Sequence, residues 1–207
     1  MDSFLDIMDF RHACKEFDNT KKISDRDIKE ILEAGRLSPS SFGMEGWKFL
    51  VTTNQELKAK IRPLCWNQKQ ITTCSHLVIY LTAIESLLPE SGIPAKRVAR
   101  KGIDEEIIEA YIQKYSNFLE DKLNSSNGIY HWGAKQTYIA MTSMMLASAS
   151  LGIDSCPIEG FKKEPLEKLL NIDTTKYQIT LLLPLGYRKN PQPKRIRLDF
   201  DEVVEFI

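Results

Sequence analysis

The sequence lacks the short motifs that usually mark a catalytic or nucleotide-binding site. It contains no GxSxG nucleophile elbow, no GxxxxGK(S/T) phosphate loop and no GxGxxG fingerprint. Its three histidines, His12, His76 and His131, lie far apart without metal-ligand spacing, so we expect no metal site. His76 opens an apolar run and is interpreted as a packed histidine. Without an evident catalytic side chain, difficult chemistry has to be carried by a bound cofactor.

Cysteine is scarce and follows no pattern. The four cysteines, at positions 14, 65, 74 and 156, form neither a CxxC pair nor a closely spaced framework. We interpret them as free thiols in a reducing compartment, which predicts a cytoplasmic protein. Cys14 stands beside Lys15, so two interpretations remain open: a thiol of lowered pKa, or a small apolar side chain, which is the more common role.

Net charge is also absent, because 28 Lys and Arg residues balance 28 Asp and Glu residues. A balanced chain has no overall field that would draw it to nucleic acid or to a membrane surface, so neither is expected as a partner. The first ten residues, MDSFLDIMDF, carry acids where a signal peptide needs basic residues. We therefore expect no signal peptide.

Long hydrophobic runs are few, and the most apolar one begins at His131. Residues 131–149 read HWGAKQTYIAMTSMMLASA and predict a helix that is apolar on nearly every side and therefore buried all round. A membrane span needs roughly twenty apolar residues. Because Lys135 and Gln136 shorten the run, we favour a buried core helix. Gly152 is expected to end it, and residues 153–161 to follow as an irregular loop.

The rest of the chain predicts several helices and three strands. Helices are expected at 3–10, 24–37, 54–62 and from Asp104 to about residue 123, and strands at 48–53, 77–82 and 179–185. Residues 86–102 read as a long polar connection. Helices precede and follow the strands, which favours an α+β sheet covered by helices. A chain of 207 residues suits one domain with a sizeable core, or two small ones.

Basic residues cluster near both ends of the chain. Arg11, His12 and Lys15 lie within five residues, and Arg195 and Arg197 lie near the C-terminus. A charge run is often only a solvated face, and that interpretation remains open here. If the clusters converge, they can bind a phosphate, since each charge-assisted hydrogen bond contributes about 1.5–3 kcal/mol. Four or five such contacts would hold a phosphorylated cofactor without a covalent bond.

Six segments, in one consistent order, resemble the nitroreductase family. They are RHACKEFD at 11–18, LSPSSFGMEGWKFLV at 37–51, SHLVIYLTA at 75–83, AKQTYIAM at 134–141, LGIDSCPIEGF at 151–161 and KRIRL at 194–198. The sequence is most similar to the oxygen-insensitive, FMN-dependent NAD(P)H nitroreductases and their dihydropteridine reductase relatives. The resemblance implies one FMN-binding domain over residues 1–207, with a mostly antiparallel central sheet flanked by helices. It also implies an interlocked homodimer that holds FMN between its subunits.

The resemblance further implies a ping-pong reaction. NADH or NADPH reduces the flavin and leaves, and a nitroaromatic, a quinone or a related small-molecule acceptor then takes two electrons. No catalytic side chain is implied. Two other functions remain open, namely a slow or non-catalytic flavin-binding carrier and another reaction on the same scaffold. Flavin breakdown and reductive dehalogenation fit less well, because the AKQ and PIEGF stretches follow the nitroreductase pattern.

The resemblance assigns site residues position by position. Residues that match the phosphate grip are Arg11, Arg195 and Arg197, and those along the ribityl chain and pyrimidine end are His12, Ala13, Lys15 and Gln70. Ser40, Ser41 and Gly43 match a loop from the partner subunit, and Asn67 and Gln136 match amide contacts. Pro157, Ile158, Glu159 and Gly160 match the loop over one flavin face. The substrate side is assigned to Lys15, Phe42, Asn67 and Phe118.

Several positions depart from the family pattern. Ala13 stands where relatives often have Ser, Gly43 replaces Asn, and Gln70 replaces a Lys found in some relatives near the pyrimidine. With Gln70, the negative charge on a reduced flavin is expected to be less stabilised. Lys194 adds a basic residue beside Arg195, so either side chain fits the phosphate grip. The sequence does not distinguish NADH from NADPH and does not identify the physiological acceptor.

Overall fold

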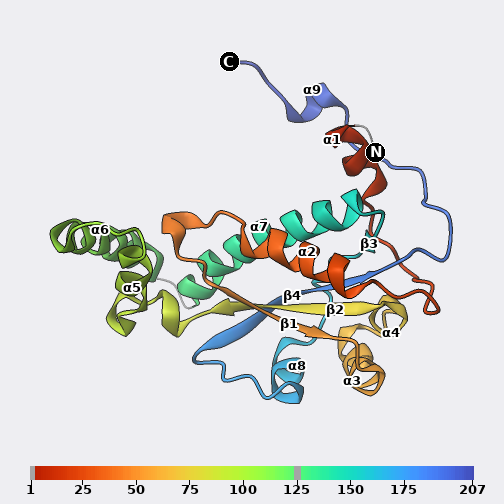
Figure 1. Cartoon of the computed structure of the whole chain (residues 1–207), viewed down its shortest axis with the longest axis horizontal. Coiled ribbons are helices and arrows are strands. Elements are labelled where there is room, and N and C mark those ends of the chain that lie inside the picture. Colours follow the sequence, from red (N-terminus) through yellow and green to blue (C-terminus); the bar gives the residue numbers. More distant parts are fainter. Residues whose placement is uncertain (1–2, 124–126) are drawn as a thin grey trace.

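The computed structural model describes residues 3–123 and 127–207. Within these residues one antiparallel sheet has the strand order β1-β2-β4-β3 (Figure 1). The strands are β1 (Trp47–Thr52), β2 (His76–Ala83), β3 (Asp154–Ser155) and β4 (Tyr177–Gly186). Helices flank the sheet, so the predicted α+β fold is confirmed. The three predicted strands are present, whereas β3 lies inside the stretch that was expected to be an irregular loop.

Strands β2 and β4 are continuous apolar runs because both of their faces are buried. Val78 and Tyr80 on one face pack with Met144, whereas Ile79 packs with Ile61 in the core on the other face. Both strands are buried along nearly their whole length. A strand covered on both sides needs no polar alternation, which explains why these two runs were readable from the sequence.

The helices cover the sheet on two faces and at one end (Figure 1). Helices α2 (Asp25–Arg36) and α7 (Gly128–Ser150) cover one face, and α3 (Gln55–Ile61), α4 (Gln70–Thr73) and α8 (Lys163–Leu169) the other. Helices α5 (Ile93–Ala99) and α6 (Glu105–Leu123) form the end, while α1 (Phe4–Phe10) and α9 (Phe200–Val203) lie beyond α7. Ser24 and Asn54 cap α2 and α3 as their positions predict.

The expected polar connection at 86–102 contains a helix. Pro94 occupies the first turn of α5, where its missing N–H costs nothing, and Val98 buries its side chain. Apolar contacts over one turn are enough to order this short helix. The helix is too short for its sequence to show a helical repeat of apolar residues. The stretch predicted as a long polar connection therefore includes a helix that the sequence analysis did not predict.

Helix α7 organises the core but is not buried all round. Gly133 lets it approach β2, because a Cβ at this position would lie 2.6 Å from Cγ2 of Thr82. On the opposite side Lys135, Ile139 and Thr142 form an exposed stripe, with Ile139 39% exposed. The prediction that this helix is buried on every side is therefore wrong for the single chain. None of the described helices is long and apolar enough to cross a membrane.

Candidate functional site

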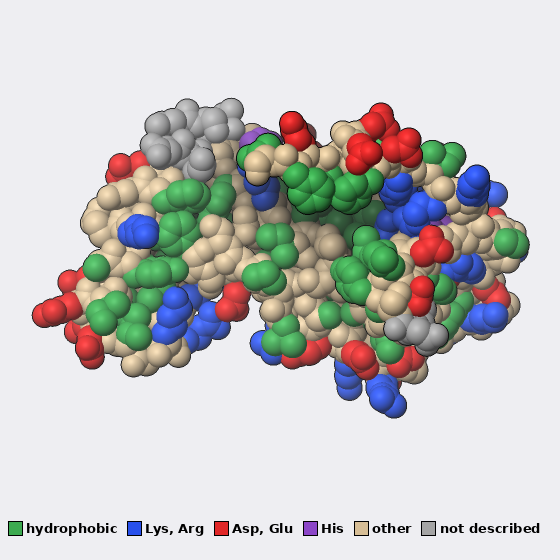
Figure 2. Space-filling model, turned by 90° about the horizontal axis from the view of Figure 1, so that it is seen from above, with side chains coloured by type: hydrophobic (Ala, Val, Ile, Leu, Met, Phe, Trp, Pro, Cys, Tyr) green, Lys and Arg blue, Asp and Glu red, His purple; other side chains and the backbone are tan. Residues whose placement is uncertain are grey.

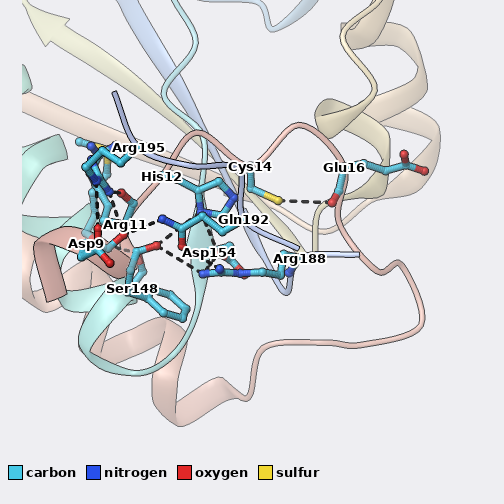
Figure 3. Close-up of polar contacts among 12 residues, drawn as sticks. Asp9, Arg11, His12, Cys14, Glu16, Ser148, Asp154, Arg188, Gln192 and Arg195 are labelled. Atoms are coloured by element: carbon cyan, nitrogen blue, oxygen red, sulfur yellow. Dashed lines mark hydrogen bonds and ion pairs between the residues drawn. The ribbon is translucent and has the colours of Figure 1, made fainter. Parts of the chain in front are cut away.

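Two segments from opposite ends of the chain form a cationic pocket, which we call the clamp pocket. It has a volume of about 210 Å³ and is lined by Arg11, His12, Ala13, Gln192, Pro193, Lys194, Arg195, Ile196 and Arg197. Arg11 caps the C-terminal end of α1, and the chain then runs extended beside β3 through a bridge between Ala13 and Ser155. After β4 the tail returns along this segment, so the two predicted basic clusters do converge (Figure 3).

The guanidinium groups at the clamp pocket repel one another. Burial lowers the pKa of Arg11, and the charges of Arg195 and Arg197 lower this pKa further. Among the lining residues, all within the described part of the chain, none is acidic. Asp9, which is not a lining residue, places its Oδ1 3.4 Å from Nε of Arg195. The lining itself remains cationic, which raises the local potential and favours an anion. Seen from the side of α1 and α9, Lys and Arg side chains gather beside a hollow bordered by apolar side chains (Figure 2).

Arg195 also holds the end of α1 in place. Its Nη2 donates to the carbonyl oxygens of Met8, at 2.8 Å, of Asp9, at 2.9 Å, and of Arg11. These are carbonyls that the last helical turn leaves without partners. Of the two candidates left open by the sequence, Arg195 is therefore already engaged with the backbone, and Lys194 lines the pocket beside it.

A buried carboxylate ties the segments of the clamp pocket together. Asp154 on β3 is 3% exposed, and its Oδ2 accepts the backbone N–H of Arg188 at 2.8 Å. Its Oδ1 lies 2.7 Å from Nη2 of Arg188 and 3.5 Å from Nδ1 of His12, neither aligned as a hydrogen bond. Arg188 in turn donates to Gln192 at 2.8 Å, and Gln192 donates to the Asp9 carbonyl at 2.7 Å (Figure 3). Sequence reasoning did not single out Asp154 or Gln192, whose importance depends on these long-range contacts.

His12 should make the stability of the protein depend on pH. Burial lowers its pKa from the ordinary 6.5, and Arg188 lowers it further while Asp154 opposes this. As pH falls below 6.5, the unfolded chain takes up the proton before the folded one does. The free energy of unfolding should therefore decrease on acidification. We expect a smaller decrease in His12→Gln than in the unmodified protein when denaturant melts at about pH 7.5 and about pH 5.5 are compared. Equal decreases would contradict this role for His12.

A second cavity of about 380 Å³ adjoins the clamp pocket and shares His12, Ala13 and Pro193 with it. Lys15 and Lys69 also line it, and Nζ of Lys15 lies 3.8 Å from Sγ of Cys156. Cys14 is buried, which raises the pKa of its thiol to about 11. This favours the interpretation of Cys14 as a small apolar side chain over that of a nucleophile.

Gln70 points into the protein. Its amide donates to Oε1 of Gln68 at 2.8 Å and approaches Sγ of Cys156 at 3.7 Å, and its side chain is buried. The neighbouring Asn67 is exposed, with its backbone held by Arg62. The position that differs from the family pattern thus contributes to buried packing around Cys156. Gln68 and Cys156 were not predicted as site residues.

The loop 157–160 is anchored on the sheet and on its neighbours. Ile158 exchanges two backbone hydrogen bonds with Leu182, at 2.9 and 3.0 Å. Gln68 donates to the Gly160 carbonyl at 3.1 Å, and the Tyr138 hydroxyl donates to Glu159 at 2.5 Å. Pro157 directly follows Cys156 and is half-buried. These contacts fix the loop directly after Cys156, whose Sγ lies 3.8 Å from Nζ of Lys15 and 3.7 Å from Nε2 of Gln70.

The remaining predicted residues form a separate group toward the N-terminal half of α7. The Ser41 backbone N–H donates to Oε1 of Gln136 at 2.8 Å, and Ser40 accepts from the Glu45 N–H at 2.8 Å. The rings of Phe42 and Phe118 lie 5.1 Å apart, and Gly43 takes the positive φ of 67° that the turn needs. The residues that line the clamp pocket lie at 11–13 and 192–197, next to α1, and α1 lies at the C-terminal end of α7 (Figure 1). One chain therefore does not bring these residues to the clamp pocket.

Comparison with known proteins identifies one family. The family described as the nitroreductase family matches residues 8–187. The provisionally named NAD(P)H nitroreductase YfkO of Bacillus subtilis is 39% identical, covering 98% of this chain and 96% of its own length. A provisionally named NAD(P)H nitroreductase of Staphylococcus epidermidis is also 39% identical, covering 99% and 97%. The crystal structure of a provisionally assigned nitroreductase from Exiguobacterium sibiricum in complex with FMN superposes with a TM-score of 0.83, at 23% identity and with 100% and 98% coverage.

Proposed function

Since this chain belongs to the nitroreductase family, we propose that it is an FMN-dependent oxidoreductase that uses NADH or NADPH to reduce nitroaromatics, quinones or related acceptors. The observation that carries the proposal is the clamp pocket, where guanidinium groups from both ends of the chain meet without an acidic lining residue. FMN ends in a phosphate, and fork-shaped guanidinium donors match phosphate geometry. The donor set therefore fits the group that the family implies.

We assign the cofactor along the two adjoining cavities. Arg11 and Arg197 would hold the phosphate, assisted by Lys194, while Arg195 keeps α1 in position. Lys15 would place its charge near the polar edge of the ring, and the backbone amides near Glu159 and Gly160 would donate to it. FMN, when bound, supplies the two-electron chemistry that the side chains lack. The chain binds the phosphate, orients the ring and leaves one ring face open to donor and acceptor.

We further propose that a second copy of the chain completes the site. The exposed stripe of α7 and the apolar side chains of α1 and of the tail are what a partner subunit would bury. The exposed apolar residues of these three segments are Phe4, Leu5, Met8, Ile139, Ile196, Leu198, Phe200, Val203, Phe206 and Ile207. The tail with α9 projects away from the sheet (Figure 1). In such a homodimer, the partner would bring Ser40, Ser41, Gly43 and Gln136 to the cofactor, and Phe42 and Phe118 to the acceptor. We treat residues 1–207 as one FMN-binding domain in a reducing, cytoplasmic environment.

The function is tested with the purified protein. We expect a yellow protein whose flavin is bleached by NADH or NADPH under argon and regains its colour with menadione or nitrofurazone. Steady-state oxidation of each nicotinamide with these acceptors then measures turnover. A protein that stays colourless after incubation with FMN would contradict the assignment of the cofactor. FMN binding without acceptor-dependent oxidation of the nicotinamide would instead favour a flavin carrier.

A further inference from the structure

Trp66 holds an unusual backbone conformation next to the loop 157–160. It follows a short 3-10 turn (Arg62–Cys65) and takes a φ of 52° and a ψ of 33°, and Asn67 follows with a φ of 55°. Left-handed backbone is disfavoured for a bulky side chain and is maintained only when the surroundings impose it. Here the Asn67 N–H donates to the Arg62 carbonyl at 3.1 Å, and the Arg62 Nε donates back to the Asn67 carbonyl at 3.1 Å. The turn is thus held in a form that costs conformational free energy.

The effect of this turn is to lay the indole of Trp66 on Gly160. A Cβ at Gly160 would lie 2.6 Å from Cε3 and 2.7 Å from Cζ3 of the indole, so only glycine permits the contact. Gln68, two residues on, donates to the Gly160 carbonyl at 3.1 Å. The indole of Trp66 and the side-chain amide of Gln68 therefore contact the same glycine, so residues 66–68 pack together on the loop 157–160.

Most of the indole nevertheless faces solvent. Trp66 is 71% exposed, whereas Trp132 is 6% exposed and Trp47 is half-buried. A single exposed aromatic side chain is common and by itself needs no explanation. Trp66 differs because a strained turn and a required glycine both serve to place it, and because it borders the loop assigned to the flavin face.

We propose that Trp66 is a specificity-determining residue that stacks on the planar, electron-poor ring of the acceptor. This inference rests on the proposed function and names the part of the acceptor that the chain recognises. An indole offers an electron-rich face that stacks in an offset geometry on a nitroaromatic or quinone ring. Its exposure leaves the face of the indole free for a ligand that enters and leaves at each turnover. The contact is non-covalent, and no electron or proton passes through Trp66.

The test compares aromatic and non-aromatic acceptors in Trp66→Ala, Trp66→Phe and the control Trp47→Phe. With NADPH as donor, Trp66→Ala should raise the KM for menadione and nitrofurazone about tenfold, and Trp66→Phe by less, with kcat less affected. The KM for ferricyanide, which has no ring to stack, should not change. Titration with nitrofurazone should quench indole emission in the unmodified protein and in Trp47→Phe, but much less in Trp66→Phe.

Three results would overturn the inference. The first is an equal rise in KM for ferricyanide, the second is loss of FMN on dialysis of Trp66→Phe, and the third is a change in its oligomeric state on gel filtration. The last two would assign Trp66 to the cofactor site and to a subunit contact, respectively. Trp66→Phe retains an aromatic ring, so the inference stays testable if Trp66→Ala does not fold. A failure of the proposed function is distinguishable, because the unmodified protein would then lack FMN or turnover.

Discussion

Replacing Arg197 by alanine is expected to lower the affinity for FMN by about 10- to 100-fold, since one charge-assisted hydrogen bond to a phosphate contributes about 1.5–3 kcal/mol. Arg197 lines the clamp pocket from the exposed tail, and its Nη1 donates only to the carbonyl of the adjacent Ile196 at 2.6 Å among the contacts described. Its removal should therefore cost binding energy with little cost in stability. Flavin occupancy after extensive dialysis, and the Kd from quenching of flavin fluorescence, measure the effect.

The matched control for this substitution is Arg36→Ala. Arg36 lies on α2 and pairs with Glu33 at 2.6 Å on an exposed surface, so its loss changes the net charge equally without touching the clamp pocket. FMN affinity should be unchanged in this control. Arg197→Lys keeps the charge but loses the planar fork, and should fall between the two. If Arg197→Ala retained flavin as well as Arg36→Ala does, the phosphate would not be bound by this side chain.

The features that could be predicted from the sequence are those that depend on residues close together along the chain. The runs at 77–82 and 179–185 predict central strands because burial on both faces leaves an uninterrupted apolar pattern. The caps Ser24 and Asn54 are equally local, since each accepts a hydrogen bond from a residue three positions on. The basic clusters and the family resemblance together identify the convergence of the two chain ends, which composition alone leaves open.

Other features depend on contacts between distant residues, and these escaped prediction. Arg195 lines the clamp pocket, but the hydrogen bonds from its Nη2 to carbonyl groups of α1, more than 180 residues away, were not predicted. The burial of Gln70 against Gln68 and Cys156 was also not predicted; a neutral amide with hydrogen-bond partners costs less to bury than a charged lysine would. The strained turn at Trp66 could not be predicted from the sequence, because tryptophan rarely adopts a positive φ.

Asp154 offers the largest expected effect on stability. Replacing Asp154 by alanine should lower the free energy of unfolding by about 3 kcal/mol, because removing one partner of a buried ion pair leaves the other charge uncompensated. The Arg188 side chain is 23% exposed, so water relieves part of the penalty and the lower end of the usual range is expected. The backbone N–H of Arg188 also loses its acceptor.

The control is Glu33→Ala, which breaks an exposed ion pair on α2 and should lower the free energy of unfolding by about 0.5 kcal/mol or less. Urea denaturation at neutral pH gives both values.

A double substitution separates the charge from the packing. In Asp154→Ala combined with Arg188→Met, no charge is left buried and the methionine still fills space beside Phe10, over whose ring Arg188 now lies at 4.2 Å. The double variant should therefore be less destabilised than the sum of the two single variants, by about 1–3 kcal/mol of coupling. Additive losses would mean that the two groups stabilise the fold independently. The same ion pair ties residues 9–12 to the tail at 188–197. Although Asp154 does not line the clamp pocket, Asp154→Ala alone should therefore also weaken FMN retention.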